Sequence, residues 1–204
     1  MNLQKILLLT VSLLANPLTT RAAELVDITA CATVTAADAE KFIGGPLDVT
    51  RIDKKIMINA PWSHDSLCTY LPRGVKTDDP TEIARFLDVN LRFFPTVEAA
   101  QAIHQATLDQ FRKMAGSPES PYKIIAMNPI EGLSASAFYV ELHAGPKSDY
   151  KSAMIMFVKN TVGGAISAWK KPESSLELSK AVLQHVLTKL PYWFGDHKFA
   201  WPRL

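Results

Sequence analysis

The stretch ARFLDVNLRFF, residues 84–94, alternates apolar and polar side chains more regularly than any other part of the chain. Its apolar positions are Leu87, Val89, Leu91 and Phe93, and its intervening polar positions are Asp88, Asn90 and Arg92. A period of two predicts a β-strand with one buried face and one wetter face, which is typical of an antiparallel sheet.

The rest of the chain supplies further strand patterns and a few helices. Strands are predicted at 47–58, 67–71, 122–127, 135–144, 153–159 and 165–169, with a turn at 62–65. Helices are predicted at 33–46, 96–115 and 174–190, with Thr35 and Thr96 as N-caps of the first two. The segment 153–159 is apolar on both faces, which indicates an interior strand. Because the helices are too few to connect parallel strands, we expect an α+β fold with a mainly antiparallel sheet of about six or seven strands and three helices.

The N-terminus has the pattern of an export signal. A short segment with Lys5 precedes the apolar run ILLLTVSLL at 6–14, and small residues at Thr20 and Ala22 suit cleavage after Ala22. We therefore expect a signal peptide at 1–22 and a single α+β domain at 23–204, in a periplasmic or extracellular protein. The apolar run is shorter than the roughly 20 residues that span a bilayer, so no membrane span is expected.

Cys31 and Cys68 are the two cysteines of the chain. In an exported protein, a structural disulfide is the default interpretation of such a pair. The sequence ITAC at 28–31 also looks like a lipoprotein processing box, in which a lipid would be attached to Cys31. Residues including Glu24 and Asp27 separate this box from the apolar run, and lipidation would leave Cys68 unpaired, so the disulfide is favoured.

The first part of the mature chain also shows a family resemblance. Cys31 is followed by TAADAE at 35–40, GGP at 44–46 and CTY at 68–70. This order resembles the opening of small exported domains of unknown function found in actinobacterial lipoproteins, which share a cysteine, a short helix ending in glycine, a strand, and a second cysteine followed by an aromatic residue. The chain departs from them in lacking a lipobox next to its signal, and the resemblance implies no catalytic residues.

Charge and motifs exclude several classes of function. Without Lys5 and Arg21 of the leader, the chain has 20 acidic residues and as many basic ones. A neutral chain argues against nucleic acid as a partner and against electrostatic membrane anchoring. The histidines show no metal-ligand spacing, and glycine-rich nucleotide motifs are missing, so neither a metal nor another cofactor is expected.

Two predicted strands carry polar residues at alternate positions: Asp88, Asn90 and Arg92 on one, and Tyr139, Glu141 and His143 on the other. If these strands were neighbours, they would form a polar platform able to bind a small polar ligand or to perform acid–base chemistry. Its candidate catalytic residues are Glu141, His143, Arg92 and Asp88. A solvated sheet face explains the same pattern and is the simpler interpretation.

His104 interrupts the apolar stripe of the helix predicted at 96–115. It is either a ligand or base in a pocket between helix and sheet, or a histidine at the edge of the core that is hydrogen-bonded to a neighbour. The second interpretation is favoured. The positions four residues away are Ala100 and Leu108, so the paired-ligand arrangement of zinc enzymes is missing.

The C-terminal segment PYWFGDHKFAWPRL, residues 191–204, is rich in aromatic side chains. Trp193 and Trp201 could bind a sugar, a membrane interface or a protein, or the tail could pack over a sheet edge or a helix groove. The leading hypothesis is an exported cell-envelope binding or interaction module, whose partner is an unknown protein or a small polar ligand. The alternative is a small exported hydrolase or other acid–base enzyme that uses the polar sheet face.

Overall fold

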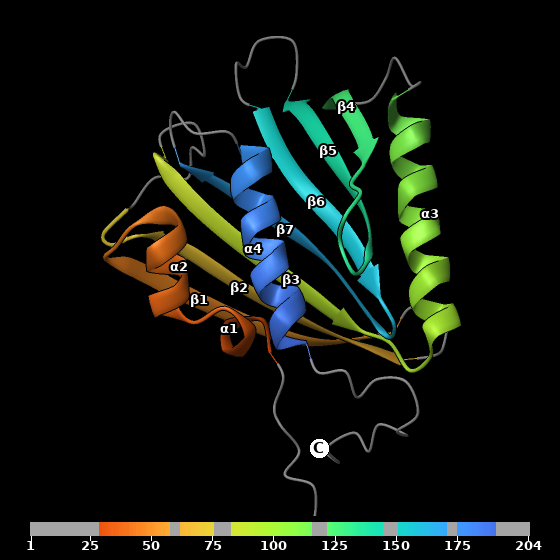
Figure 1. Ribbon diagram of the computed structural model, residues 1–204, viewed down its shortest axis with the longest axis horizontal. Helices are drawn as coiled ribbons and strands as arrows, with labels where there is room; N and C mark the ends of the chain where they lie inside the picture. The colour runs from red at the N-terminus through yellow and green to blue at the C-terminus, as the bar shows by residue number, and fades with distance from the viewer. Residues whose placement is uncertain are drawn as a thin grey trace, which may run out of the picture.

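The computed structural model describes residues 29–57, 62–75, 83–115, 122–144, 151–170 and 175–190. They form a seven-stranded sheet in which each strand pairs antiparallel with its neighbours, with helices packed against it (Figure 1). The predicted α+β fold with a mainly antiparallel sheet is confirmed. The predicted signal peptide, 1–22, lies outside the described residues.

The elements follow the predicted order, with one helix added at the start. The strands are β1 (Leu47–Met57), β2 (Trp62–Pro72), β3 (Arg85–Phe93), β4 (Tyr122–Pro129), β5 (Ser136–Ala144), β6 (Lys151–Lys159) and β7 (Val162–Lys170). The helices are α1 (Ala30–Thr33), α2 (Ala36–Ile43), α3 (Val97–Ala115) and α4 (Ser175–Lys189). The sheet order is β1-β2-β3-β7-β6-β5-β4, so β4 to β7 form a meander and β6 is an interior strand, as predicted.

Strand β2 differs from its prediction. It begins at Trp62, so the predicted turn at 62–65 is wrong, and its pairing with β1 runs from Leu47 opposite Pro72 to Met57 opposite Trp62. The charged run at 53–55 does not end β1, because β1 is an edge strand, where charged residues are common. The longer β2 brings Asp65 into the sheet, opposite Arg92 of β3.

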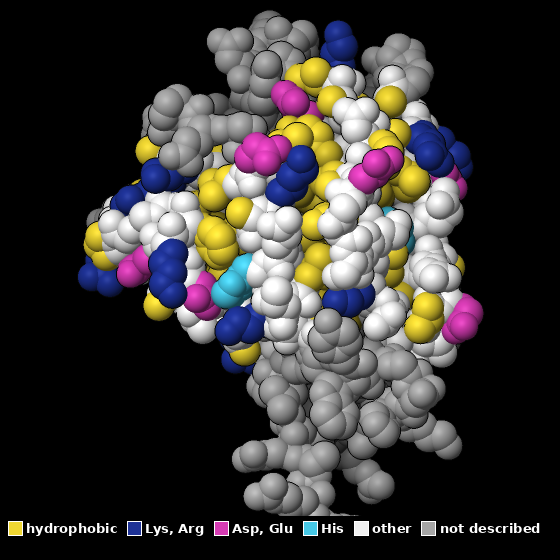
Figure 2. All heavy atoms as spheres, in the orientation of Figure 1, with side chains coloured by type: hydrophobic (Ala, Val, Ile, Leu, Met, Phe, Trp, Pro, Cys, Tyr) yellow, Lys and Arg dark blue, Asp and Glu magenta, His cyan; other side chains and the backbone are white. Residues whose placement is uncertain are grey.

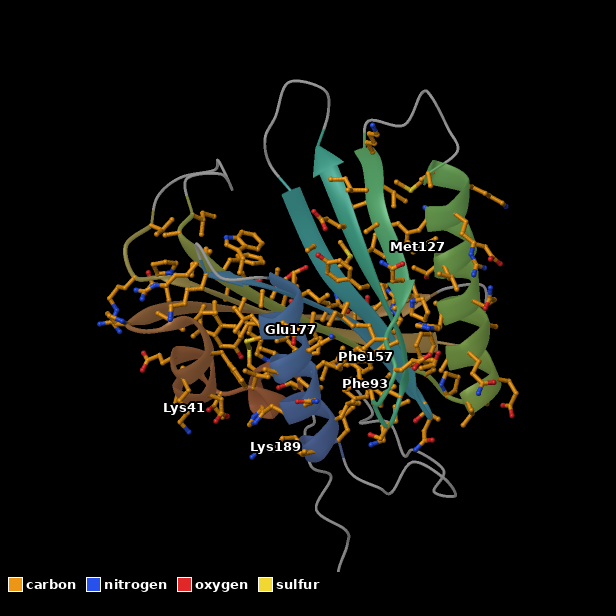
Figure 3. All side chains as sticks on the ribbon, turned by 45° about the horizontal axis from the view of Figure 1, so that its top comes forward. Lys41, Phe93, Met127, Phe157, Glu177 and Lys189 are labelled. Carbon is orange, nitrogen blue, oxygen red and sulfur yellow. A yellow bond between two sulfur atoms is a disulfide. The ribbon has the colours of Figure 1, made fainter. Side chains whose placement is uncertain are left out.

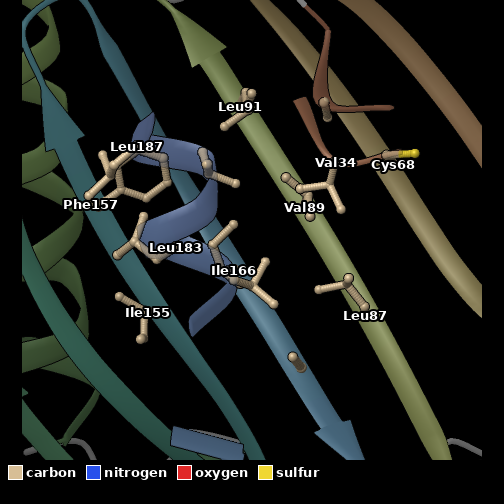
Figure 4. Packing of buried hydrophobic residues seen from close by; sticks show 14 of the residues in the cluster. Val34, Cys68, Leu87, Val89, Leu91, Ile155, Phe157, Ile166, Leu183 and Leu187 are labelled. Carbon is tan, nitrogen blue, oxygen red and sulfur yellow. The ribbon is translucent and has the colours of Figure 1, made fainter. Parts of the chain in front are cut away.

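We call the face of the sheet covered by α1, α2 and α4 the inner face. Leu87, Val89, Leu91 and Phe93, the predicted apolar face of β3, are at most 4% exposed and lie here. They pack in one cluster with residues of β6, β7 and α4, among them Phe157, Ile166 and Leu183 (Figures 3 and 4). Full burial of each such side chain contributes about 1.5–3 kcal/mol, so this layer is the main stabilising core.

Helix α2 begins and ends as the sequence predicts. Thr35 Oγ1 accepts a hydrogen bond from the backbone N–H of Asp38 (3.2 Å), and the Asp38 carboxylate accepts one from the N–H of Thr35. Gly44 ends the helix with φ of 82°, in the left-handed region that favours glycine. The helix is therefore fixed by local sequence at both ends.

The disulfide between Cys31 and Cys68 joins α1 to β2, with the two Cα atoms 5.2 Å apart. This confirms the predicted pairing and leaves Cys31 no thiol for a lipid. Two hydrogen bonds hold the same junction: the N–H of Ala30 donates to Ser66 Oγ (2.9 Å), and the Tyr70 hydroxyl donates to the carbonyl oxygen of Val34. The N-terminal helices are thus attached to the sheet by covalent and polar contacts.

Candidate functional site

The opposite face of the sheet, which we call the outer face, is partly covered by α3. Thr96 caps this helix, since its Oγ1 accepts a hydrogen bond from the N–H of Ala99 (3.1 Å), as predicted. Ala100 is the one buried residue of α3, whereas five residues of α4 are at most 6% exposed: Ser179, Val182, Leu183, Val186 and Leu187. Helix α3 is therefore held less tightly against the sheet than α4.

A cavity of about 290 Å³ lies between α3 and the outer face. It forms because β7 presents small residues, Gly163 and Ala165, beneath the helix. A Cβ atom at Gly163 would come within 3.2 Å of Phe94 Cε2, so even one added carbon would crowd this part of the floor. The cavity has about twice the volume of an engineered apolar cavity of about 150 Å³ that holds benzene, so it has room for a small organic molecule.

The cavity walls are mostly apolar, with polar groups from both sides. The apolar lining residues include Phe94, Ile103, Phe111, Met154, Met156 and Ala165. The polar lining residues are Asn90 and Arg92 on the sheet and His104 and Thr107 on α3. Apolar walls with a few polar groups are typical of sites that bind small molecules.

Arg92 is held by a carboxylate on the neighbouring strand. Its Nη2 donates to Asp65 Oδ2 (2.6 Å) and its Nε to Asp65 Oδ1, which makes a two-pronged ion pair. Asp65 is buried, with 8% of the residue exposed. Since a guanidinium has five N–H donors, Arg92 is neutralised by Asp65 and still has donors for another acceptor.

His104 lies at the junction of the cavity with a second hollow of about 480 Å³, which also includes Ser134 and Lys159. Its ring contacts that of Phe138, with centroids 5.1 Å apart. Burial lowers the pKa of His104, so the imidazole is neutral at pH 7 and can both donate and accept a hydrogen bond. His104 lies between helix and sheet, and this position is compatible with both interpretations from the sequence, a ligand or base in a pocket and a histidine at the edge of the core.

Replacing His104 with leucine should reduce the loss of stability in acid. The lowered pKa means that the unfolded chain binds a proton as the pH falls through about 6.5 while the folded protein resists it, so acid favours unfolding. No carboxylate is among the lining residues of either hollow to oppose this, and Arg92 and Lys159 are cations. Urea unfolding at about pH 7 and about pH 5 measures the effect.

Thr107→Val is the control for this change, because it alters the same cavity without a titratable group. It should keep the pH dependence of the wild type. If His104→Leu loses as much stability in acid as the wild type does, the neutral state assigned to His104 is wrong.

The predicted polar platform does not form. Strands β3 and β5 are separated by β7 and β6, and the pairings Tyr139–Ile155, Ile155–Ile166 and Ile166–Val89 place Tyr139 on the inner face. Strand alternation puts Glu141 on the inner face too, where its Oε2 accepts from the Tyr139 hydroxyl (3.3 Å). Tyr139 and Glu141 therefore lie on the face opposite to Asp88 and Arg92. The alternation of side chains shows which residues of one strand share a face, but not which strands are neighbours.

The remaining candidates are placed as follows. Asp88 lies on the outer face, where Thr69 Oγ1 donates to its Oδ1 (2.6 Å); burial raises the pKa of Asp88, and the bond from Thr69 acts against that shift. His143 is in β5, opposite Lys151, and its side chain lies outside the described part. Trp193 and Trp201 lie outside the described residues, so their binding role stays a prediction.

Within the described ranges, no cluster of three or more His, Cys, Asp or Glu side chains could hold a metal ion. None of the helices described is long and apolar enough to cross a membrane. On the face shown in Figure 2, acidic and basic side chains are interspersed, without a large patch of one sign.

Several residues of the cavity were not singled out from the sequence. The sequence predicts a turn at Asp65, the partner of Arg92 on the cavity wall, and an interior strand at 153–159, which contains Met154 and Met156. Gly163 precedes the strand predicted at 165–169. The available signal was the apolarity of 153–159 on both faces, which indicates a cover on each side but not the gap beneath it.

Comparisons with known proteins show a likeness of fold. No family model matches the chain, and no curated protein sequence matches it. Among solved structures, the extracellular domain of PknH from Mycobacterium tuberculosis is similar, with a TM-score of 0.51 and 11% sequence identity. The match covers 77% of this chain and 94% of that domain. At this identity, the likeness shows a shared fold alone.

Proposed function

We propose that this protein is an exported module that binds a small, largely apolar ligand in the cavity between α3 and the outer face. The observation that carries the proposal is the cavity itself, about 290 Å³, with apolar walls and hydrogen-bonding groups on both sides. The sequence suggested a small polar ligand, but the phenylalanine and methionine side chains of the walls favour an apolar one.

Export is supported by independent features. The N-terminal sequence has the order of a signal peptide, and Cys31 and Cys68 are joined in a disulfide, which persists in oxidising compartments. The similar fold of PknH is that of an extracellular domain. Together these support a module that works in the periplasm or outside the cell.

The arrangement supports binding over the acid–base alternative. Glu141 lies on the inner face, away from Asp88 and Arg92 on the outer face. The ionisable residues that line the cavity are Arg92 and His104, and Arg92 is engaged by Asp65. A general acid–base pair needs two groups within reach of one substrate, and the described candidates do not converge in that way.

Filling the cavity should weaken binding of an apolar probe. N-phenylnaphthylamine, an uncharged dye that fluoresces more strongly in apolar surroundings, is titrated into the full chain. Ala165→Leu adds three carbons beneath α3 and should weaken binding about tenfold or more, equivalent to at least about 1.4 kcal/mol.

Ala102→Leu is the matched control, because Ala102 is an exposed residue of α3, the helix above the cavity, and lines neither hollow. It should bind the dye as the wild type does. Equal binding by the wild type and Ala165→Leu, or no binding at all by the wild type, would contradict the proposal.

A further inference from the structure

We infer that the ligand of this cavity is uncharged, and that Asp65 sets this preference by neutralising the cation on the cavity wall. The inference rests on the proposed function, because it specifies the ligand of that same site. It follows from the charges around the cavity, from the free-energy cost of moving a charged ligand out of water, and from the N–H donors of Arg92 that Asp65 does not use.

Counted together with Asp65, which pairs with Arg92, the cavity lining has no net charge at pH 7. Its ionisable members are Arg92 and His104. The guanidinium of Arg92 meets the Asp65 carboxylate through two N–H groups, with 2.6 Å between Nη2 and Oδ2. His104 is neutral there, because burial disfavours its protonated form.

An anionic ligand at the remaining N–H donors of Arg92 would lie beside the Asp65 carboxylate, which would repel it, or would have to displace that carboxylate. The side chain of Asp65 is 11% exposed and that of Arg92 is 27% exposed, so water screens the pair weakly. Separating the pair would leave a largely buried carboxylate without its partner, and a charge transferred from water into the apolar cavity loses its hydration. The phenylalanine and methionine side chains of the walls have no N–H or O–H donors that could replace the hydration of an anion.

The adjoining hollow is lined by another cation, Lys159. Its Nζ lies 3.3 Å from Ser134 Oγ and 3.5 Å from the carbonyl oxygen of Leu187, near the C-terminus of α4. Carbonyl groups at a helix C-terminus attract a cation. Lys159 is therefore directed toward α4 and does not supply the charge that an anion in the cavity would need.

An uncharged ligand with a hydroxyl, carbonyl or amine group meets suitable partners. Arg92 has N–H donors beyond the two that Asp65 uses, and the Asn90 amide both donates and accepts. On the helix side, the neutral imidazole of His104 does the same. The Thr107 hydroxyl donates to the carbonyl oxygen of Ile103 (2.8 Å), and its oxygen can accept a second bond.

Two dyes of the same skeleton test the preference. N-phenylnaphthylamine is uncharged, and anilinonaphthalenesulfonate carries a sulfonate on the same ring system. Both are titrated into the full wild-type chain at about pH 7, with Ala165→Leu to identify binding in the cavity. The wild type should bind the uncharged dye about tenfold or more tightly than the anion.

Asp65→Asn identifies the residue responsible. It keeps the shape of the side chain and removes its charge, so Arg92 becomes an unpaired cation on the cavity wall. The variant should bind the sulfonate dye about tenfold or more tightly than the wild type does, with little change for the uncharged dye. Asp48→Asn is the control, because it removes an exposed carboxylate that lies 3.8 Å from Arg73 on the β1–β2 edge, and it should leave both affinities unchanged.

The outcomes separate the inference from the proposed function. If the wild type binds the sulfonate dye as tightly as the uncharged one, and Ala165→Leu abolishes both, the site stands and the preference for an uncharged ligand is overturned. If neither dye responds to Ala165→Leu, the proposed function fails as well. If Asp65→Asn folds with an unchanged ratio of affinities, Asp65 does not set the preference; should it fail to fold, the wild-type ratio alone decides whether the ligand is uncharged.

Discussion

Replacing Cys31 and Cys68 together with serine should lower the free energy of unfolding by about 4 kcal/mol. The two cysteines are 37 positions apart, so the bridge closes a long loop that contains α2 and β1. A cross-link of this length removes many conformations from the unfolded chain, and the loss of that restriction is the expected cost. Urea unfolding of the oxidised wild type and the double variant measures the difference.

The reduced wild type is the matched control for the serine variant. It lacks the cross-link but keeps both sulfur atoms, so its stability should agree with that of the double variant. If the oxidised and reduced proteins unfold at the same urea concentration, the bridge does not stabilise the fold, and the contacts of Ser66 and Tyr70 hold the N-terminal helices by themselves.

Replacing Gly164 with alanine should destabilise the protein by about 3 kcal/mol or more. The added Cβ atom would overlap the backbone carbonyl oxygen of Asn90 on β3 and approach Phe157 Cε1 to 3.0 Å. The carbonyl cannot move aside without disturbing the pairing of β3 with β7, which joins the two halves of the sheet. Thermal or urea unfolding measures the loss.

Gly163→Ala is the matched control, one residue away on the same strand. Its Cβ would meet the ring edge of Phe94 at 3.2 Å and the carbonyl oxygen of Phe157 at 3.4 Å, which are tight but smaller conflicts. The cost at Gly163 should therefore be clearly smaller than at Gly164. Equal losses at the two positions would mean that the close approach of β3 and β7 is not what requires glycine at Gly164.

The parts of the fold that depend on local sequence could be predicted. The alternation of 84–94 identified β3 and its buried face, and Thr35, Gly44 and Thr96 marked helix ends through capping groups within a few residues. The pairing of Cys31 with Cys68 followed from composition and compartment. The strand and the helix ends depend on residues within a few positions of each other. The disulfide could be predicted because two cysteines allow one pairing.

The parts of the fold that depend on contacts between distant segments could not be predicted from the sequence. β3 pairs with β7, although α3 and three strands lie between them in the chain, and this pairing separates Asp88 from Tyr139 and Glu141. The local sequence predicts a turn at Asp65, because the residue that pairs with it in the sheet, Arg92, is on another strand and is distant in the chain. The cavity forms because α3 packs over the small residues of β7, Gly163 among them. The local sequence of either element does not show that the two are in contact.

Because α3 buries few side chains against the sheet, a ligand would enter the cavity by displacing this helix. Ala100 is the one buried residue of this helix, whereas α4 and the inner strands form the core that stabilises the sheet. Regions with little buried surface open at low free energy, while the rest of a protein stays folded. Exchange between the cavity and solvent can therefore proceed through displacement of a single helix, so the rate of ligand exchange and the global stability of the fold are set by different parts of the molecule.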